Sequence, residues 1–215
     1  GAWLARLVDC LAPPGMFGPA AHLAALRSLQ AGTTTVIDNG PTGAGVAALT
    51  ASGQRGVVHH EAFGGDPADA ASRAERVADA IAALDDAAGP RVAVGVSPHA
   101  PYSAGPALWN ALAERLPAGT SWSTHIAESL DERASLRGEH GALGDALGRL
   151  GVAPAAWPDA AHGSSVRAMA AAGVLRPGLI AAHLVHVDEA DVALLAERGV
   201  RAAHCPISNA TLRCG

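Results

Sequence analysis

The stretch that decides the fold is Ser121-Trp122-Ser123-Thr124-His125-Ile126-Ala127-Glu128. Its residue pattern predicts a short buried strand that runs into a loop. Such a strand would deliver a histidine and, three residues later, a carboxylate into one small volume. A neutral imidazole is a good ligand for zinc or iron, and a carboxylate beside a metal-bound water can carry a proton. Alone, such a pair more often marks a hydrogen-bonded structural histidine followed by a charge in the first turn of a helix.

The composition is that of a globular chain with a substantial core. Of its 215 residues, 49% are hydrophobic and 16% are charged, and the net charge is −5. No basic run interleaves with aromatic residues, and no apolar run reaches the ~18 residues that span a membrane, so we expect neither a nucleic-acid nor a membrane partner. Three cysteines without a CxxC pair fit a reducing, cytoplasmic location. The chain has no lysine, which excludes Schiff-base chemistry and a P-loop lysine.

Short apolar strands alternate with helices along the chain. The expected strands cover residues 33–38, 56–61, 92–99, 121–128, 179–186 and 200–206. The expected helices cover about 19–31, 45–52, 67–87, 105–116 and 188–198, with two or three short helices in the long excursion after residue 128 and a loop over 207–215. This alternation predicts an α/β fold with parallel strands, either a doubly wound sheet or a (β/α)₈ barrel. No linker divides the chain, so residues 1–215 are expected to form one domain.

Ionisable residues gather at the carboxyl ends of the expected strands, where (β/α) barrels carry their active sites. In chain order these residues are Asp38, His60, Glu61, His99, His125, His183, His186 and His204. Only 10 of the 215 residues are histidines, yet five of the six strand ends carry one. Two prolines flank His99 and fix its backbone as the strand gives way to a turn. The distribution favours a metal site or an acid–base site at this end of the fold.

Five motifs, in order, resemble the amidohydrolase superfamily. They are GTTTVID (32–38), SPHAPYS (97–103), THIAES (124–129), AAHLVHVD (181–188) and HCPISNATLRCG (204–215). The resemblance is to the mononuclear-metal group, which includes aminodeoxyfutalosine, adenosine-type and S-adenosylhomocysteine-type deaminases and triazine hydrolases. It implies a TIM barrel whose intact protein hydrolyses carbon–nitrogen bonds other than peptide bonds. The expected reaction is deamination of a purine-like or other N-heterocyclic small molecule by a metal-activated water.

The resemblance also implies roles for single residues. His125 matches the metal ligand after the fifth barrel strand, and Glu128 matches the catalytic proton shuttle. His183 matches the catalytic histidine after the sixth strand, and His99 matches a substrate-binding histidine after the fourth. We therefore expect one divalent metal ion, zinc or alternatively iron, and no other cofactor-binding residue. The remaining residues in family-like positions are expected to be structural: Asp38, His186, His204 and Asn209.

Two parts of the family pattern have no counterpart in this sequence. They are an HxH pair of metal ligands after the first barrel strand and an aspartate after the eighth. The chain would then hold about six of eight β/α units, strands two to seven, as a partial barrel truncated at both ends. We expect an internal fragment that, alone, is inactive and binds metal poorly. The exact substrate, deamination against dechlorination, the identity of the metal and a homo-oligomeric state are left open by the sequence.

Two alternative interpretations rest on other features. Residues 43–48, Gly-Ala-Gly-Val-Ala-Ala, follow a strand and open a helix, and Glu61 ends the next strand about twenty residues later, which is typical of an NAD-binding Rossmann-type protein. Against this, the five residues 39–43 separate Asp38 from the second position of the motif, and the pattern explains none of the histidines. The other alternative is a catalytically inactive barrel fragment with a structural or oligomerisation role.

Overall fold

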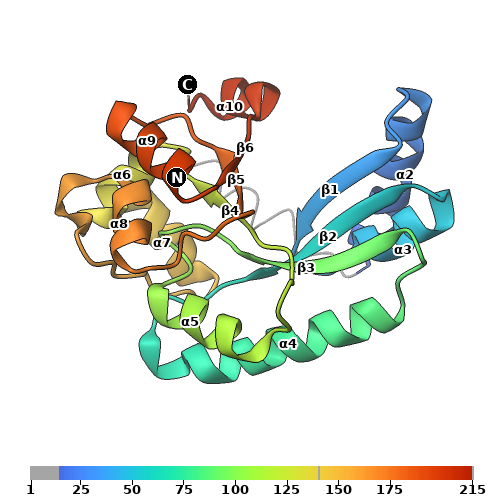
Figure 1. Cartoon of the computed structure of the whole chain (residues 1–215), viewed down its shortest axis with the longest axis horizontal. Coiled ribbons are helices and arrows are strands. Elements are labelled where there is room, and N and C mark those ends of the chain that lie inside the picture. The colour runs from blue at the N-terminus through green and yellow to red at the C-terminus, as the bar shows by residue number, and fades with distance from the viewer. Residues whose placement is uncertain (1–14, 140, 215) are drawn as a thin grey trace.

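The computed structural model describes residues 15–139 and 141–214 and contains two sets of parallel strands (Figure 1). The first set is β1 (Thr35–Gly40), β2 (Arg55–Ala62) and β3 (Val92–Pro98), paired in that order. The second is β4 (Ser123–Ile126), β5 (Ile180–His183) and β6 (Arg201–Ala203), also paired in chain order. Every ladder is parallel and helices lie between the strands, so the predicted α/β class is confirmed.

Hydrogen bonds join the two sets between β3 and β4. The Val96 N–H donates to the Ser121 carbonyl at 2.9 Å, and the His125 N–H donates to the His99 carbonyl at the same distance. The strands therefore follow one another from β1 to β6 in chain order. Because all of them are parallel, their carboxyl ends meet along one edge, as consecutive strands do in the wall of a barrel.

The connecting helices agree closely with the sequence periodicity. They are α2 (Phe17–Gln30), α3 (Ala44–Ser52), α4 (Ala70–Asp86), α5 (Pro106–Arg115) and α9 (Glu189–Glu197). The excursion after β4 holds α6 (Leu130–Leu136), α7 (Gly141–Arg149), the 3-10 turn η2 (Ala160–His162) and α8 (Ser165–Ala171). The helix expected from residue 67 starts instead with the 3-10 turn η1 (Pro67–Asp69), because the Asp66 side chain accepts the Ala68 N–H at 2.9 Å.

One expected element is wrong. The segment expected as a loop over 207–215 contains α10 (Pro206–Leu212), which begins with a proline whose missing N–H is no loss at that position. Asn209 on this helix is buried, so α10 is held against the rest of the fold. The strand expected over 121–128 ends at Ile126, and Glu128 therefore lies in the loop that follows it.

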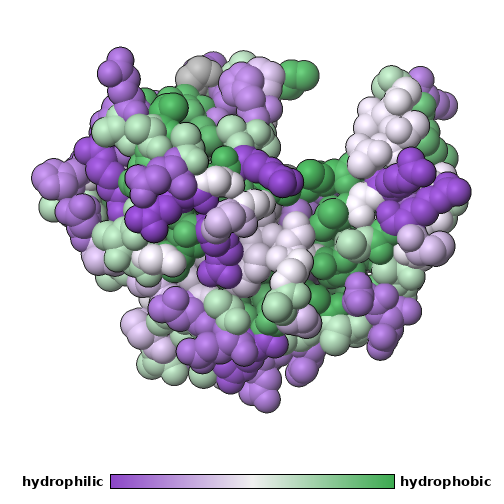
Figure 2. Space-filling model, in the orientation of Figure 1, coloured by the Kyte–Doolittle hydropathy of each residue, from purple (hydrophilic) through white to green (hydrophobic). Residues whose placement is uncertain are grey.

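The main hydrophobic core lies around β3, β4, β5 and the helices α5 and α8, and a smaller one lies between β1, β2, α2 and α3. In the main core the rings of Trp109 and Trp122 stack with centroids 5.5 Å apart. Figure 2 shows that the molecule is hollowed between the part that carries α2 and the part that carries α9 and α10. In the portion of the chain described here, no helix is both long enough and apolar enough to cross a membrane.

Candidate active site

The carboxyl ends of four neighbouring strands bring one carboxylate and three histidines together. Glu61 comes from β2, His99 directly follows β3, His125 lies in β4 and His183 ends β5. Ring centroids are 5.1 Å apart for His99 and His125 and 5.3 Å apart for His125 and His183. One candidate ligand atom from each of Glu61, His99 and His125 lies within 4.8 Å of the other two. The predicted histidines 99, 125 and 183 thus form one cluster, and Glu61 joins them.

The two ring nitrogens of His125 face different partners. Nδ1 lies 3.2 Å from Nε2 of His183, and Nε2 lies 3.3 Å from Oε1 of Glu61. His183 Nδ1 lies 2.8 Å from Oδ1 of Asn209, an acceptor, which assigns the proton of neutral His183 to Nδ1. Nε2 of His183 then accepts from Nδ1–H of His125, and Nε2 of His125 points a lone pair at the Glu61 carboxylate. Two acceptors at this distance need a cation between them, either a proton or a metal ion.

His99 is oriented from the turn that follows it. The Ser103 hydroxyl donates to the Ala100 carbonyl at 3.2 Å, so it accepts the proton on Nδ1 of His99 at 2.7 Å. The His99 ring also stacks on Phe63, with centroids 4.6 Å apart. Nε2 is therefore the lone-pair nitrogen of His99, which is the form of imidazole that binds a metal or accepts a proton.

Burial and mutual charge set the protonation of the cluster. Burial, and next the proximity of His125, lowers the pKa of His99 to about 4. Burial opposes a charge on His125 too, but the hydrogen bond and negative charge of Glu61 leave the pKa of His125 above its ordinary value. Burial would raise the pKa of Glu61, but its hydrogen bond with His125 and the neighbouring imidazoles bring that pKa below the ordinary value. The cluster therefore favours a neutral His99 and an ionised Glu61.

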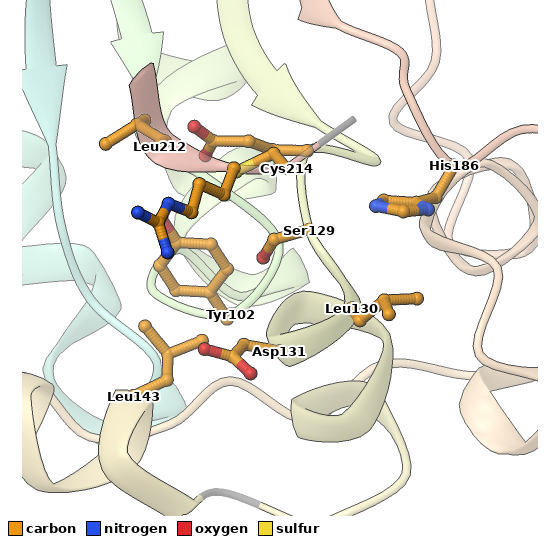
Figure 3. A pocket seen from close by; sticks show the side chains of 10 residues that line it. Tyr102, Ser129, Leu130, Asp131, Leu143, His186, Leu212 and Cys214 are labelled. Atoms are coloured by element: carbon orange, nitrogen blue, oxygen red, sulfur yellow. The ribbon is translucent and has the colours of Figure 1, made fainter. Parts of the chain in front are cut away.

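Glu128 lies between the histidine cluster and a cavity. Its Oε1 is 3.5 Å from Nε2 of His183, and its side chain also lines a cavity of about 350 Å³. The other lining residues are Tyr102, Ser129, Leu130, Asp131, Leu143, His186, Leu212, Arg213 and Cys214. Figure 3 shows Tyr102 and His186 on opposite sides of this cavity, with Ser129 between them in the view. A carboxylate in this position can exchange protons with the cluster and with a molecule in the cavity.

The remaining strand-end residues lie outside the cluster. Asp38 on β1 packs against α3, since a Cβ on Gly45 would lie 2.3 Å from Oδ2 of Asp38. His204 is exposed after β6, and His186 lines the cavity rather than joining the cluster. Asn209, expected to be structural, orients His183 from α10.

The Rossmann-type interpretation is wrong. Gly43 adopts φ +66° at the start of α3, and a Cβ there would lie 2.4 Å from the Leu84 side chain. Gly45 likewise makes room for Asp38, so both glycines serve the packing of α3 rather than the approach of a pyrophosphate. Glu61, the expected ribose-binding acid of that interpretation, faces His125 instead.

Sequence reasoning missed two functional contacts of the cluster. Glu61 is among the strand-end residues that the sequence places at the shared edge, but its contact with His125 was not predicted, because the sequence alone does not say which strand ends meet. Ser103 follows His99 by four residues, inside a turn that two prolines begin, which is a spacing suited to a local hydrogen bond.

Comparison with known proteins agrees with the fold. The amidohydrolase family pattern matches residues 3–215. A 5-methylthioadenosine/S-adenosylhomocysteine deaminase from Symbiobacterium thermophilum is 32% identical over 197 residues, which are 90% of this chain and 40% of that protein. The chain thus spans about 40% of the length of this relative.

Two solved structures share the fold. The structure of a Xanthomonas campestris adenosine deaminase with bound zinc matches 93% of this chain and 41% of its own, with a TM-score of 0.65 and 24% identity. The Helicobacter pylori aminofutalosine deaminase matches 89% of this chain and 47% of its own, with a TM-score of 0.70 and 18% identity. At these identities the likeness shows a common fold.

Proposed function

The chain belongs to the amidohydrolase family, and on that premise we propose that the intact protein is a metal-dependent hydrolase that deaminates a purine-like substrate. The observation that carries the proposal is the position of Glu128, 3.5 Å from His183 on one side and on the wall of the cavity on the other. The name of the relative from Symbiobacterium thermophilum, a 5-methylthioadenosine/S-adenosylhomocysteine deaminase, supports deamination over dechlorination.

We place the described strands within a larger barrel. In this proposal β1 to β6 are strands two to seven of eight, and residues 1–215 are one partial barrel domain of a longer protein. The fraction of the relative's length that the chain spans supports this, as does the strand order. The 215 residues alone would be inactive, because the HxH pair and the last-strand aspartate of the family pattern are not among them.

The residues of the cluster fit a divalent metal ion. Two imidazole nitrogens and a carboxylate oxygen are a donor set that zinc and iron both accept, and the lone pair of His125 Nε2 already faces an anion. We propose that His125 binds the ion and that Glu61 and His99 are the further donors that this chain can offer. Zinc, the metal bound in the Xanthomonas campestris structure, is the proposed ion, with iron as the alternative. The chemistry that such an ion supplies is the acidification of a water molecule to a pKa of ~7.

The chain's own residues handle the protons. Glu128 accepts a proton from the attacking water on the side of the cluster. It delivers this proton to a ring nitrogen or to the departing amine in the cavity. Asn209 holds Nδ1–H of His183, so that Nε2 of His183 stays beside Glu128 and beside the oxygen that adds to the substrate. His99 has one free ring nitrogen, Nε2, so it serves either as a donor to the ion or, as the family pattern implies, as a contact to the substrate. The amine leaves as ammonia, and a carbonyl replaces it on the ring.

The cavity suits a small heterocyclic molecule. Its volume of about 350 Å³ is at the lower end of the ~300–1,000 Å³ that small-molecule sites occupy. Tyr102 offers a ring for a base to contact, and Leu143 adds apolar surface beside it. Adenine nucleosides, with a polar ring and an exocyclic amine, are the substrate class that we propose.

Ammonia release tests the proposed function. The zinc-loaded full-length protein is mixed separately with 5-methylthioadenosine, S-adenosylhomocysteine, adenosine and a chlorotriazine. We expect ammonia from at least one adenine nucleoside, loss of activity after chelation and recovery when zinc is restored. Chloride release from the triazine without any ammonia would assign a dechlorinase instead. Activity that survives complete removal of the metal would contradict the proposal.

A further inference from the structure

Glu132 is a completely buried carboxylate whose hydrogen bonds converge on the backbone that presents Glu128. Its Oε1 accepts the Ala127 N–H at 2.8 Å and also the Ser165 hydroxyl. Its Oε2 accepts the Glu128 N–H at 3.0 Å. A carboxylate buried without compensation is costly, so these three donors stabilise it where it stands.

The local helix cap does not require this arrangement. Ser129 and Glu132 have the S-x-x-E spacing of a capping box, and the Ser129 side chain does accept the Glu132 N–H at 3.2 Å. In a complete capping box the glutamate would reach back to the N–H of Ser129 itself. Here Glu132 reaches past the helix start and binds the two preceding N–H groups, those of Ala127 and Glu128. Its hydrogen bonds therefore serve the loop after β4 and not only the start of α6.

That loop needs to be held. Ala127 has a φ of +55°, in the left-handed region that residues with a Cβ rarely adopt. Its carbonyl accepts the N–H groups of Val185 and His186, each at 2.9 Å, from the loop after β5. Glu132 holds the N–H side of the same residue, so Ala127 is fixed from both sides. The direction in which the next residue, Glu128, leaves the backbone follows from this fixed conformation.

We propose that Glu132 is a positioning residue for Glu128, holding the Ala127–Glu128 backbone so that the Glu128 carboxylate stays between His183 and the cavity. The inference rests on the proposed function, in which Glu128 carries the proton. Ser165 on α8 is an additional anchor, because it binds Glu132 but does not contact the loop backbone through its hydroxyl. A residue that acts only through Glu128 has no effect on turnover once Glu128 can no longer carry protons.

A double-mutant cycle tests the proposal in the zinc-loaded full-length protein. Glu132→Gln keeps the volume of the side chain but turns an NH₂ group toward one of the backbone donors. We expect kcat to fall by about 10- to 100-fold with little change in KM or zinc content, as small displacements of a reacting group do. In the Glu128→Gln background, Glu132→Gln should cause no further fall in kcat, because the two losses are not independent. Glu132→Asp keeps the carboxylate but shortens the side chain by one methylene. This variant is measured alone and together with Glu128→Gln in case Glu132→Gln does not fold.

Two control variants complete the cycle. Ser165→Ala removes one hydrogen-bond donor to Glu132 and leaves both bonds from the loop backbone, so kcat should stay within about threefold of the unmutated protein. Glu139→Gln changes an exposed carboxylate and should have no effect. Additive losses in the cycle, or a normal kcat for Glu132→Gln while Glu128→Gln is impaired, would overturn the positioning role alone. A normal kcat for Glu128→Gln would overturn both this inference and the proposed function.

Discussion

His125 Nδ1 lies 3.2 Å from Nε2 of His183, and this contact determines what the other nitrogen of His125 can do. Asn209 fixes the proton of His183 on Nδ1, so a neutral His125 donates through Nδ1 and keeps its lone pair on Nε2. That lone pair faces Glu61 at 3.3 Å. The hydrogen bonds from Asn209 on α10 through His183 on β5 therefore determine which nitrogen of His125 on β4 faces the carboxylate.

The hydrogen bond from His183 to Asn209 predicts that two substitutions of Asn209 differ in their effect on kcat. Asn209→Ala removes the acceptor for His183 Nδ1–H, and kcat in the full-length protein should fall by about 10-fold, as expected for a buried donor left unpaired. Asn209→Asp keeps an acceptor oxygen in the same place and should retain most of the activity. Steady-state kinetics of the two variants checks this. Equal losses in both would show that the amide matters for another reason.

Glu61 should contribute to metal affinity. Replacing the carboxylate in Glu61→Gln removes the negative charge that faces His125 Nε2, and metal affinity should fall by roughly 10- to 100-fold. Competition with a chelator, followed by metal analysis of the full-length protein, measures the change. Glu139→Gln is the matched exposed control. Unchanged affinity for Glu61→Gln would remove Glu61 from the metal site.

Much of this arrangement could be predicted from the sequence, and the misses have physical reasons. Strands such as 56–61 and 92–99 could be predicted from the sequence because parallel strands covered on both faces are short and apolar. The contact between Glu61 and His125 could not be predicted from the sequence, because it depends on which strands are neighbours and how far each strand extends. Helix α10 was missed even though Pro206 is a favourable first helical residue, since nothing in a single segment of seven residues distinguishes a short helix from a loop. Glu132 was not singled out from the sequence, and only the fold shows where its carboxylate points.

The titration of Glu132 should appear in the pH dependence of stability. Burial raises the pKa of Glu132 from 4.5 to about 7, and Glu128, Tyr102 and His125 are titratable groups coupled to it. The folded protein holds the proton on the Glu132 carboxyl more tightly than the unfolded chain does. The contribution of this proton to the free energy of unfolding is therefore complete below about pH 4.5 and is lost as the pH rises through about 7.

Urea unfolding at pH 5 and pH 8 measures the effect of the Glu132 titration on stability, when the unmutated protein is compared with Glu132→Gln. The free energy of unfolding should fall more between these pH values for the unmutated full-length protein than for Glu132→Gln, which cannot titrate at this position. Parallel pH profiles for the two proteins would contradict a raised pKa for Glu132.

The cation–π contact between Arg176 and Trp122 should affect the stability of the fold without affecting kcat. The Arg176 guanidinium lies 4.0 Å from the ring centroid of Trp122, which precedes β4 in the main core. Arg176→Gln should lower the free energy of unfolding by about 0.5–2 kcal/mol and leave kcat unchanged. Arg198→Gln changes a more exposed arginine and serves as the control. A loss of turnover at full stability would assign Arg176 a role in the active site.

In the proposed function, Glu128 carries a proton between the histidine cluster and the substrate. The most direct measurement is kcat of Glu128→Gln in the zinc-loaded full-length protein, with zinc content determined in the same preparation. Glutamine fits the same space but cannot shuttle a proton, so kcat should fall by ~10² or more while the zinc content stays the same. Turnover close to that of the unmutated protein would contradict the account.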